Sequence, residues 1–187
     1  MLLNKPSVRV QASEVFKMQT RIEEELHRLV HGLPEKLPEG LGTVRFIVLT
    51  KRDLDALIRK SKTVLEIVDR QALGDDWPTP ERWPSLLPRW FIDACAHEMT
   101  PAEAQRWLAR WEKLDEEQRR AEEKGKAWAL ADWLYWMEPG RRSWWWWDSH
   151  VNDRCEVDVQ VDEWPFPWGS LSWLLRAAGA SEVMPEE

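Results

Sequence analysis

The spacing of apolar residues in the first half of the chain predicts amphipathic helices around one buried strand. Apolar residues recur every three or four positions between residues 13 and 31, which places them on one face of a helix. Residues 43–49, TVRFIVL, are β-branched and aromatic and indicate a buried strand. The helical period runs from Leu54 to residue 69; residues 63–69 alone also fit a strand, and we interpret them as helix. Another apolar helical face runs through residues 86–98.

The clearest helix start is the motif Thr100-Pro101-Ala102-Glu103. Threonine is a good N-cap, proline suits the first helical position, and the glutamate can complete a capping box. Trp107 and Trp111 follow at helical spacing, and we expect both to be largely buried. Residues 112–126 are almost wholly charged, so the pattern fits either one long charged helix or a helical hairpin.

The strand pattern is clearest near the C-terminus. Valines at positions 157, 159 and 161 alternate with polar residues, as in a strand with one apolar face. The aromatic run from Trp144 to Trp147 indicates a neighbouring strand. A short apolar helix at residues 169–178 follows, and Gly179 ends it.

The polar stretch between these two strands indicates a hairpin. A two-residue turn at 152–153 would pair Trp146 with Val159 and Trp144 with Val161. The other two tryptophans of the run would then lie beside the polar residues at 158 and 160. A shift of one residue would exchange the two faces, so this register depends on the length of the turn.

Together these elements predict an α+β fold. We expect a small antiparallel sheet, with strands near 43–49, 144–148 and 155–161, packed by four to six helices. The length of 187 residues fits one domain, which we place at residues 1–179. A proline-rich stretch marks a possible subdomain boundary near 74–84, and residues 180–187 look like an acidic C-terminal tail.

Composition narrows the classes of function. The net charge of −7 argues against a general affinity for nucleic acid or anionic membranes and favours a partner with a basic surface. The two cysteines match no zinc or redox spacing, and the first residues contain no apolar stretch long enough for export. We therefore expect a cytoplasmic protein. The chain is rich in tryptophan, with 15 residues against a single tyrosine, and most of these indoles should fill the core.

The acidic face of the C-terminal hairpin is the strongest candidate for a binding site. Carboxylates next to indoles can bind lysine or arginine through ion pairs and cation–π contacts. The candidate partner-binding residues are Trp145, Trp147, Glu156, Asp158 and Asp162. An ordinary exposed sheet face would show the same pattern, and paired carboxylates also occur in hydrolases.

Other chemistry is weakly indicated. His27 and His31 lie four residues apart on the first helix, but an exposed helix end tolerates histidine equally well. We find no catalytic spacing, and we expect neither a metal nor another cofactor. The sequence therefore favours a non-catalytic, acidic cytoplasmic protein that binds another protein, such as an immunity or antitoxin-like inhibitor or an accessory subunit. The alternative is a carboxylate-dependent hydrolase with its site near the tryptophan-rich hairpin.

Overall fold

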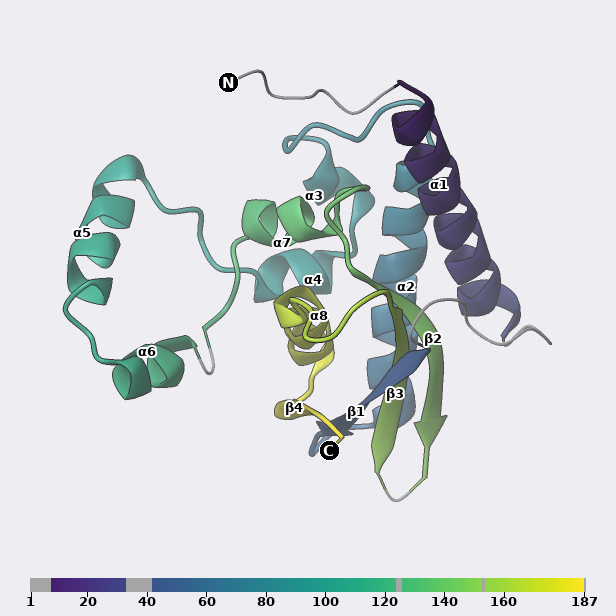
Figure 1. The fold of residues 1–187 in the computed structure, drawn as a ribbon. Helices are drawn as coiled ribbons and strands as arrows, with labels where there is room; N and C mark the ends of the chain where they lie inside the picture. Colours follow the sequence, from purple (N-terminus) through teal and green to yellow (C-terminus); the bar gives the residue numbers. More distant parts are fainter. Residues whose placement is uncertain (1–7, 33–41, 124–125, 153, 187) are drawn as a thin grey trace.

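The computed structural model describes residues 8–32, 42–123, 126–152 and 154–186 (Figure 1). In this part of the chain eight helices and four strands form, which confirms the α+β class. The helices outnumber the expected four to six because residues 83–137 divide into five short ones. In chain order the elements are α1 (Val8–His31), β1 (Thr43–Leu49), α2 (Leu54–Ala72), α3 (Trp83–Leu86), α4 (Arg89–Ala94), α5 (Pro101–Trp111), α6 (Glu116–Glu123), α7 (Leu130–Met137), β2 (Trp144–Val151), β3 (Cys155–Val161), α8 (Gly169–Ala178) and β4 (Glu182–Pro185).

The four strands form one antiparallel sheet with the order β2-β3-β1-β4. We expected residues 180–187 to form an acidic tail beyond the domain. Instead Glu182–Pro185 form β4, which pairs with β1. The stretch is too short and too acidic for a strand pattern to be visible, and β1 provides the partner that fixes it. Residues 63–69 continue α2 as expected.

The pairing of β2 with β3 confirms the expected register at one end of the hairpin. Trp144 pairs with Val161, and Trp146 pairs with Val159. All four of these side chains are buried. Their contact with the core fixes the register here, because a slip of one residue would turn the apolar face towards solvent.

Nearer the turn, the expected register is wrong. Val151 pairs with Cys155, so three residues connect the strands rather than two. Asp148 pairs with Asp158, which leaves Trp147 without a partner in a β-bulge. The bulge absorbs the additional residue of the turn, and it exchanges the two faces of β2 along the strand.

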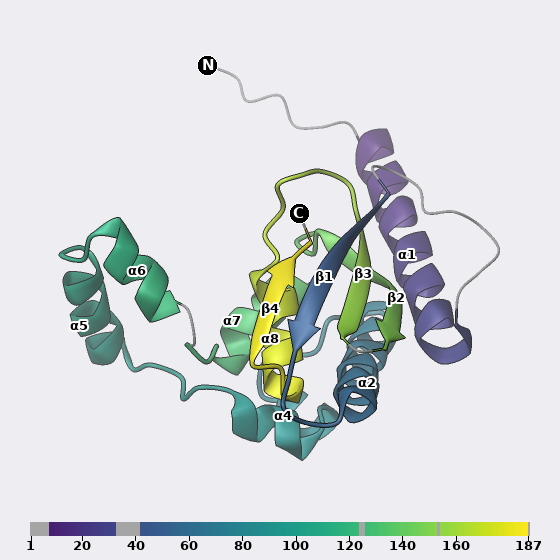
Figure 2. The same ribbon diagram turned by 90° about the horizontal axis from the view of Figure 1, so that it is seen from below.

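The core lies between one face of the sheet and the helices α2 and α8 (Figure 2). Phe46, Trp133 and Trp144 are fully buried there. Both indole N–H groups have acceptors in the first turn of α8: Trp133 donates to the Ser170 carbonyl at 3.0 Å, and Trp144 donates to the Ser170 hydroxyl at 2.9 Å. These tryptophans are therefore core residues, as expected for buried indoles with satisfied donors.

Helices α5 and α6 form an arm, residues 101–123, that lies apart from the core (Figure 1). Trp107 and Trp111 are half-buried within the arm and do not belong to the core, since no residue of α5 is fully buried. The two indoles instead stack on each other, with ring centroids 5.0 Å apart. Lys126 lies 4.1 Å from the Trp107 ring, and Arg119 lies 5.8 Å from the Trp111 ring. Stacked cations and indoles, together with an ion pair between Arg110 and Glu122 at 2.6 Å, connect the parts of the arm in place of a core.

Candidate protein-binding surfaces

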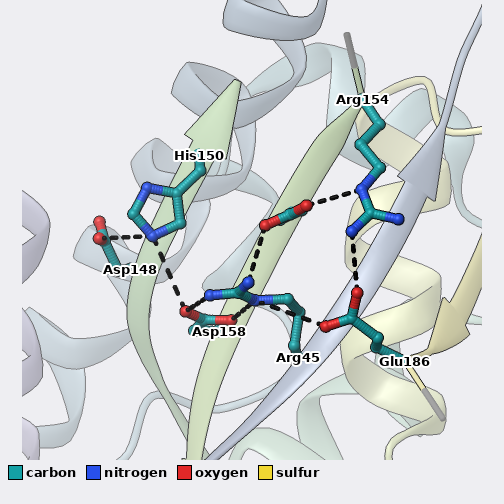
Figure 3. Close-up of polar contacts among 7 residues, drawn as sticks. Arg45, Asp148, His150, Arg154, Asp158 and Glu186 are labelled. Carbon is teal, nitrogen blue, oxygen red and sulfur yellow. Dashed lines mark hydrogen bonds and ion pairs between the residues drawn. The ribbon is translucent and has the colours of Figure 1, made fainter. Parts of the chain in front are cut away.

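The polar face of the hairpin carries a network of ion pairs around Arg45 (Figure 3). The Arg45 guanidinium donates to both carboxylate oxygens of Asp158, at 2.8 and 3.0 Å. A third nitrogen of Arg45 lies 3.0 Å from Glu156. The hydrogen bond and the charge of Asp158 raise the pKa of the Arg45 guanidinium. Asp158 is consequently a buried, bidentate partner of the chain's own arginine.

The remaining members of this network surround Asp158. His150 Nε2 lies 3.2 Å from Asp148 and 3.8 Å from Asp158. The bulge at Trp147 makes this grouping possible, because it turns residues 148 and 150 towards the polar face. Arg154 donates to Glu156 at 2.6 Å and to Glu186, beyond β4, at 2.9 Å (Figure 3). An outside cation would have to compete with arginines that already occupy these carboxylates.

The edge strand β2 of the hairpin lies against α1. Arg21 of α1 lies over the Trp145 ring at 4.6 Å and forms an ion pair with Asp162. Arg28, two turns further along, lies over the Trp147 ring at 4.7 Å. Cations on indoles beside a carboxylate are the recognition chemistry that the sequence predicted for a basic partner.

Two residues of α1 also bind the backbone of strand β2 at the bulge. The Trp146 N–H donates to the Glu25 carboxylate, and the Trp146 carbonyl accepts from Arg28 Nε at 3.1 Å. Since β2 is an edge strand, its outward backbone groups need partners from outside the sheet. For Trp146, α1 provides both partners.

Glu25 also belongs to a buried charge network that connects α1, α2 and β2. Arg142 donates to Glu25 at 2.6 Å and to Asp69 at 2.9 Å, and its guanidinium lies 4.5 Å from the Trp144 ring. Desolvation, followed by the charge of Glu25, raises the pKa of Asp69 well above its ordinary value. Desolvation also lowers the pKa of Arg28. Both carboxyl groups are fully buried, so the network positions α1 without being accessible to a substrate.

The five sequence-predicted residues therefore fall into two groups in the structure. Glu156 and Asp158 belong to the Arg45 network, whereas the indoles of Trp145 and Trp147 and the carboxylate of Asp162 face α1. Their role in binding a partner stays a prediction. The structure adds that each of them contacts an arginine of the same chain.

A large groove of about 1420 Å³ opens between the arm and the body of the protein. We call it the arm groove. Four of its large apolar side chains are exposed: Tyr135 and Leu108 are each 51% exposed, Met99 is 44% exposed and Trp136 is 38% exposed. Six aromatic side chains line it: Trp107, Trp128, Tyr135, Trp136, Trp168 and Trp173.

Sequence reasoning missed this groove because it assigned apolar helical positions to the core. Helix α7, LADWLYWM, shows the difference. Trp133 and Met137 point into the core, whereas Tyr135 and Trp136 on the other side are exposed. A helix that is apolar all round offers more apolar surface than one core contact can bury. The apolar residues on both sides of α7 were therefore the feature of the sequence that could have indicated an exposed apolar surface.

The described residues offer little that would hold a metal or cross a membrane. The rings of His27 and His31 lie 4.8 Å apart, but no group of three or more metal-binding side chains occurs in this part of the chain. None of the described helices combines the length and apolar character needed for a membrane crossing. In comparisons with known proteins, no family model, no curated protein and no solved structure matches this chain.

Proposed function

We propose that this protein is a non-catalytic binding protein whose arm groove takes a segment of another protein. The observation that carries this proposal is the concentration of exposed aromatic and aliphatic side chains in one groove. Exposed apolar residues scattered singly are normal, but a contiguous set of them marks an interaction surface. Aromatic residues are also the side chains that contribute most to protein–protein affinity.

The size of the groove supports a macromolecular ligand. Its volume of about 1420 Å³ is larger than the roughly 300–1,000 Å³ of common small-molecule sites. The arm that forms one wall has no buried residue in α5, so it gains little stability from the body. A bound partner would bury the apolar surfaces of the arm and of α7 together.

The chain's charge favours a partner with a basic surface, because the net charge of −7 attracts cations before contact. An immunity or antitoxin-like inhibitor and an accessory subunit both fit this description, with the cytoplasm as the expected location. The hydrolase alternative gains no support. Glu156 and Asp158 are paired with Arg45, and neither lines the arm groove.

Affinity capture followed by binding measurements on variants tests the proposal. Trp136→Ala should weaken binding of the captured partner by about 2 kcal/mol or more if this indole is an anchor. Phe16→Ala is the matched control, because Phe16 is 70% exposed on α1 and does not line the groove. Equal effects of the two substitutions, with both variants folded, would show that the groove is not the site.

A second pair of variants separates the arm groove from the hairpin. Asp158→Asn with Asp162→Asn removes two charges from the hairpin, and Glu116→Gln with Glu117→Gln removes the same charge from α6. If the hairpin binds the basic partner directly, only the first pair should weaken binding. Equal losses would indicate long-range attraction, which the arm groove proposal allows.

A further inference from the structure

Two arginines of α1 contact the surface of β2 beneath this helix. Arg21 and Arg28 are seven residues apart, which is about two helical turns or roughly 10.5 Å along α1. Each guanidinium lies over one indole of β2, and Arg21 also pairs with Asp162. A guanidinium suits such a site better than an ammonium group, because it is planar and can stack and donate hydrogen bonds at once. The indoles and the carboxylate therefore match arginines at this helical spacing.

The helix that occupies this surface is held mainly by polar contacts and lies outside the main core. Among α1 side chains from Phe16 onward, none belongs to the buried part of the main core, and only Leu29 packs against its rim. Ile22 is buried, but the other buried side chains of α1 are Glu25 and Arg28. Buried ion pairs contribute little net stability, because desolvation offsets their attraction. Elements with few apolar contacts open at a lower free energy than the core does.

If α1 left the sheet, the groups that it contacts on β2 would need a second helix with similar side chains. The Trp146 N–H and carbonyl would lose Glu25 and Arg28, and they would be exposed at the edge of the sheet. The indoles of Trp145 and Trp147 would be uncovered beside the Asp162 carboxylate. A helix with arginines two turns apart restores the cation–π contacts, the ion pair with Asp162 and the hydrogen bond to the Trp146 carbonyl, and a carboxylate in the place of Glu25 restores the acceptor for the Trp146 N–H.

We infer that α1 occupies, within its own chain, a binding surface for an arginine-bearing helix of a partner protein. The two helices exchange, so the partner binds only when α1 leaves. This surface is separate from the arm groove, so the inference goes beyond the proposed function. Charge complementarity identifies the partner's helix as one that carries arginine, since Arg21 and Arg28 of the same chain already bind this surface.

Hydrogen exchange of the wild-type protein tests whether α1 is separable. The amides of α1 and the Trp146 amide should exchange together, through a local opening that leaves β1 and β3 protected. Because Glu25 accepts from the Trp146 N–H, this one amide of β2 reports the departure of α1. If α1 and Trp146 are protected as strongly as β1 and β3, α1 is not a separable element and the inference is wrong.

A peptide experiment tests the arginine specificity. Glu23→Pro breaks α1 in its middle, at an exposed position. A synthetic peptide of residues 8–31 should then bind this variant. The same peptide with Arg21→Gln and Arg28→Gln should bind about tenfold or more weakly, because two cation–π contacts and one ion pair are lost. Wild-type protein should bind either peptide poorly, since its tethered α1 competes at high effective concentration.

The remaining outcomes overturn the inference. Equal binding of the two peptides would show that the surface does not recognise arginine. Absence of binding to folded Glu23→Pro protein would show that it does not accept a helix from outside. If Glu23→Pro unfolds the whole chain, α1 belongs to the cooperative core and cannot exchange.

Discussion

Replacing Arg142 with methionine should be among the most damaging single substitutions in this protein. Its side chain is 4% exposed, and its guanidinium is the shared partner of Glu25 on α1 and Asp69 on α2. Methionine fills a similar volume but leaves two buried carboxyl groups without their shared partner. Breaking a buried ion pair in this way costs about 3–5 kcal/mol. Such a loss is a large fraction of the roughly 5–15 kcal/mol that stabilises a typical domain.

The cost should also depend on pH. Burial and the charge of Glu25 raise the pKa of Asp69, so the folded protein keeps this proton to a higher pH than the unfolded chain does. The free energy of unfolding therefore falls as pH rises from about 4 through the raised pKa. Arg142 opposes this effect because its charge lowers the pKa of Asp69. Without Arg142 the pKa of Asp69 rises further and the fall continues to higher pH, so the substitution should cost more at pH 8 than at pH 5.

Urea unfolding followed by circular dichroism between pH 5 and pH 8 measures this cost, with the slope checked for two-state behaviour. Arg141→Met is the matched control, because Arg141 is 43% exposed and pairs with Glu138 at the surface. The control should lose less than about 1 kcal/mol. Adding Asp69→Asn to Arg142→Met should recover part of the loss, because one uncompensated charge is removed. Equal losses for the two arginine variants, without pH dependence, would refute this account of the network.

Three further predictions follow from burial and pairing. Trp107→Ala should change the global free energy of unfolding by less than about 1 kcal/mol, whereas hydrogen exchange of the α5 amides should become faster. Trp133→Ala removes a core indole and should lower the free energy of unfolding by about 3–5 kcal/mol. Asp158→Asn should lose about 1–2 kcal/mol in urea unfolding, because it breaks a bidentate pair; a negligible change would mean that solvent screens the pair. Burial raises the pKa of Cys95 and Cys155 to about 11, so both thiols should resist a thiol reagent at pH 8 until urea unfolds the chain; rapid labelling of the native protein would contradict this.

Several helices and strands could be predicted from the sequence because the residues that define them are close together in the chain. The capping box at Thr100 forms as expected: its N–H donates to Glu103 at 2.8 Å, and the Glu103 N–H donates back to the threonine hydroxyl at 3.4 Å. The alternation in β3 and the β-branched run of β1 also predict the strands that form. In each case the residues involved lie within a few positions of one another, so their spacing contains the required information.

The face that each tryptophan occupies depended on contacts between distant segments. In the run of four, Trp144 and Trp146 point into the core, Trp145 lies under Arg21, and Trp147 lies in a bulge under Arg28. The bulge arises from the length of the turn and the burial of the far end of the hairpin. Alternation within β2 cannot reveal it, because a bulge changes the register of one strand relative to another.

In the candidate sites, too, the sequence predicts the chemistry of the side chains, and the tertiary structure decides which residues they contact. The sequence indicates that indoles and carboxylates of the hairpin suit lysine or arginine, because that chemistry belongs to the side chains themselves. It does not indicate that Arg21, Arg28 and Arg45 of the same chain lie there. Nor does it separate the apolar residues of α7 that enter the core from those that line the arm groove. Periodicity shows that a face is apolar or charged, whereas burial and pairing depend on which other element packs against that face.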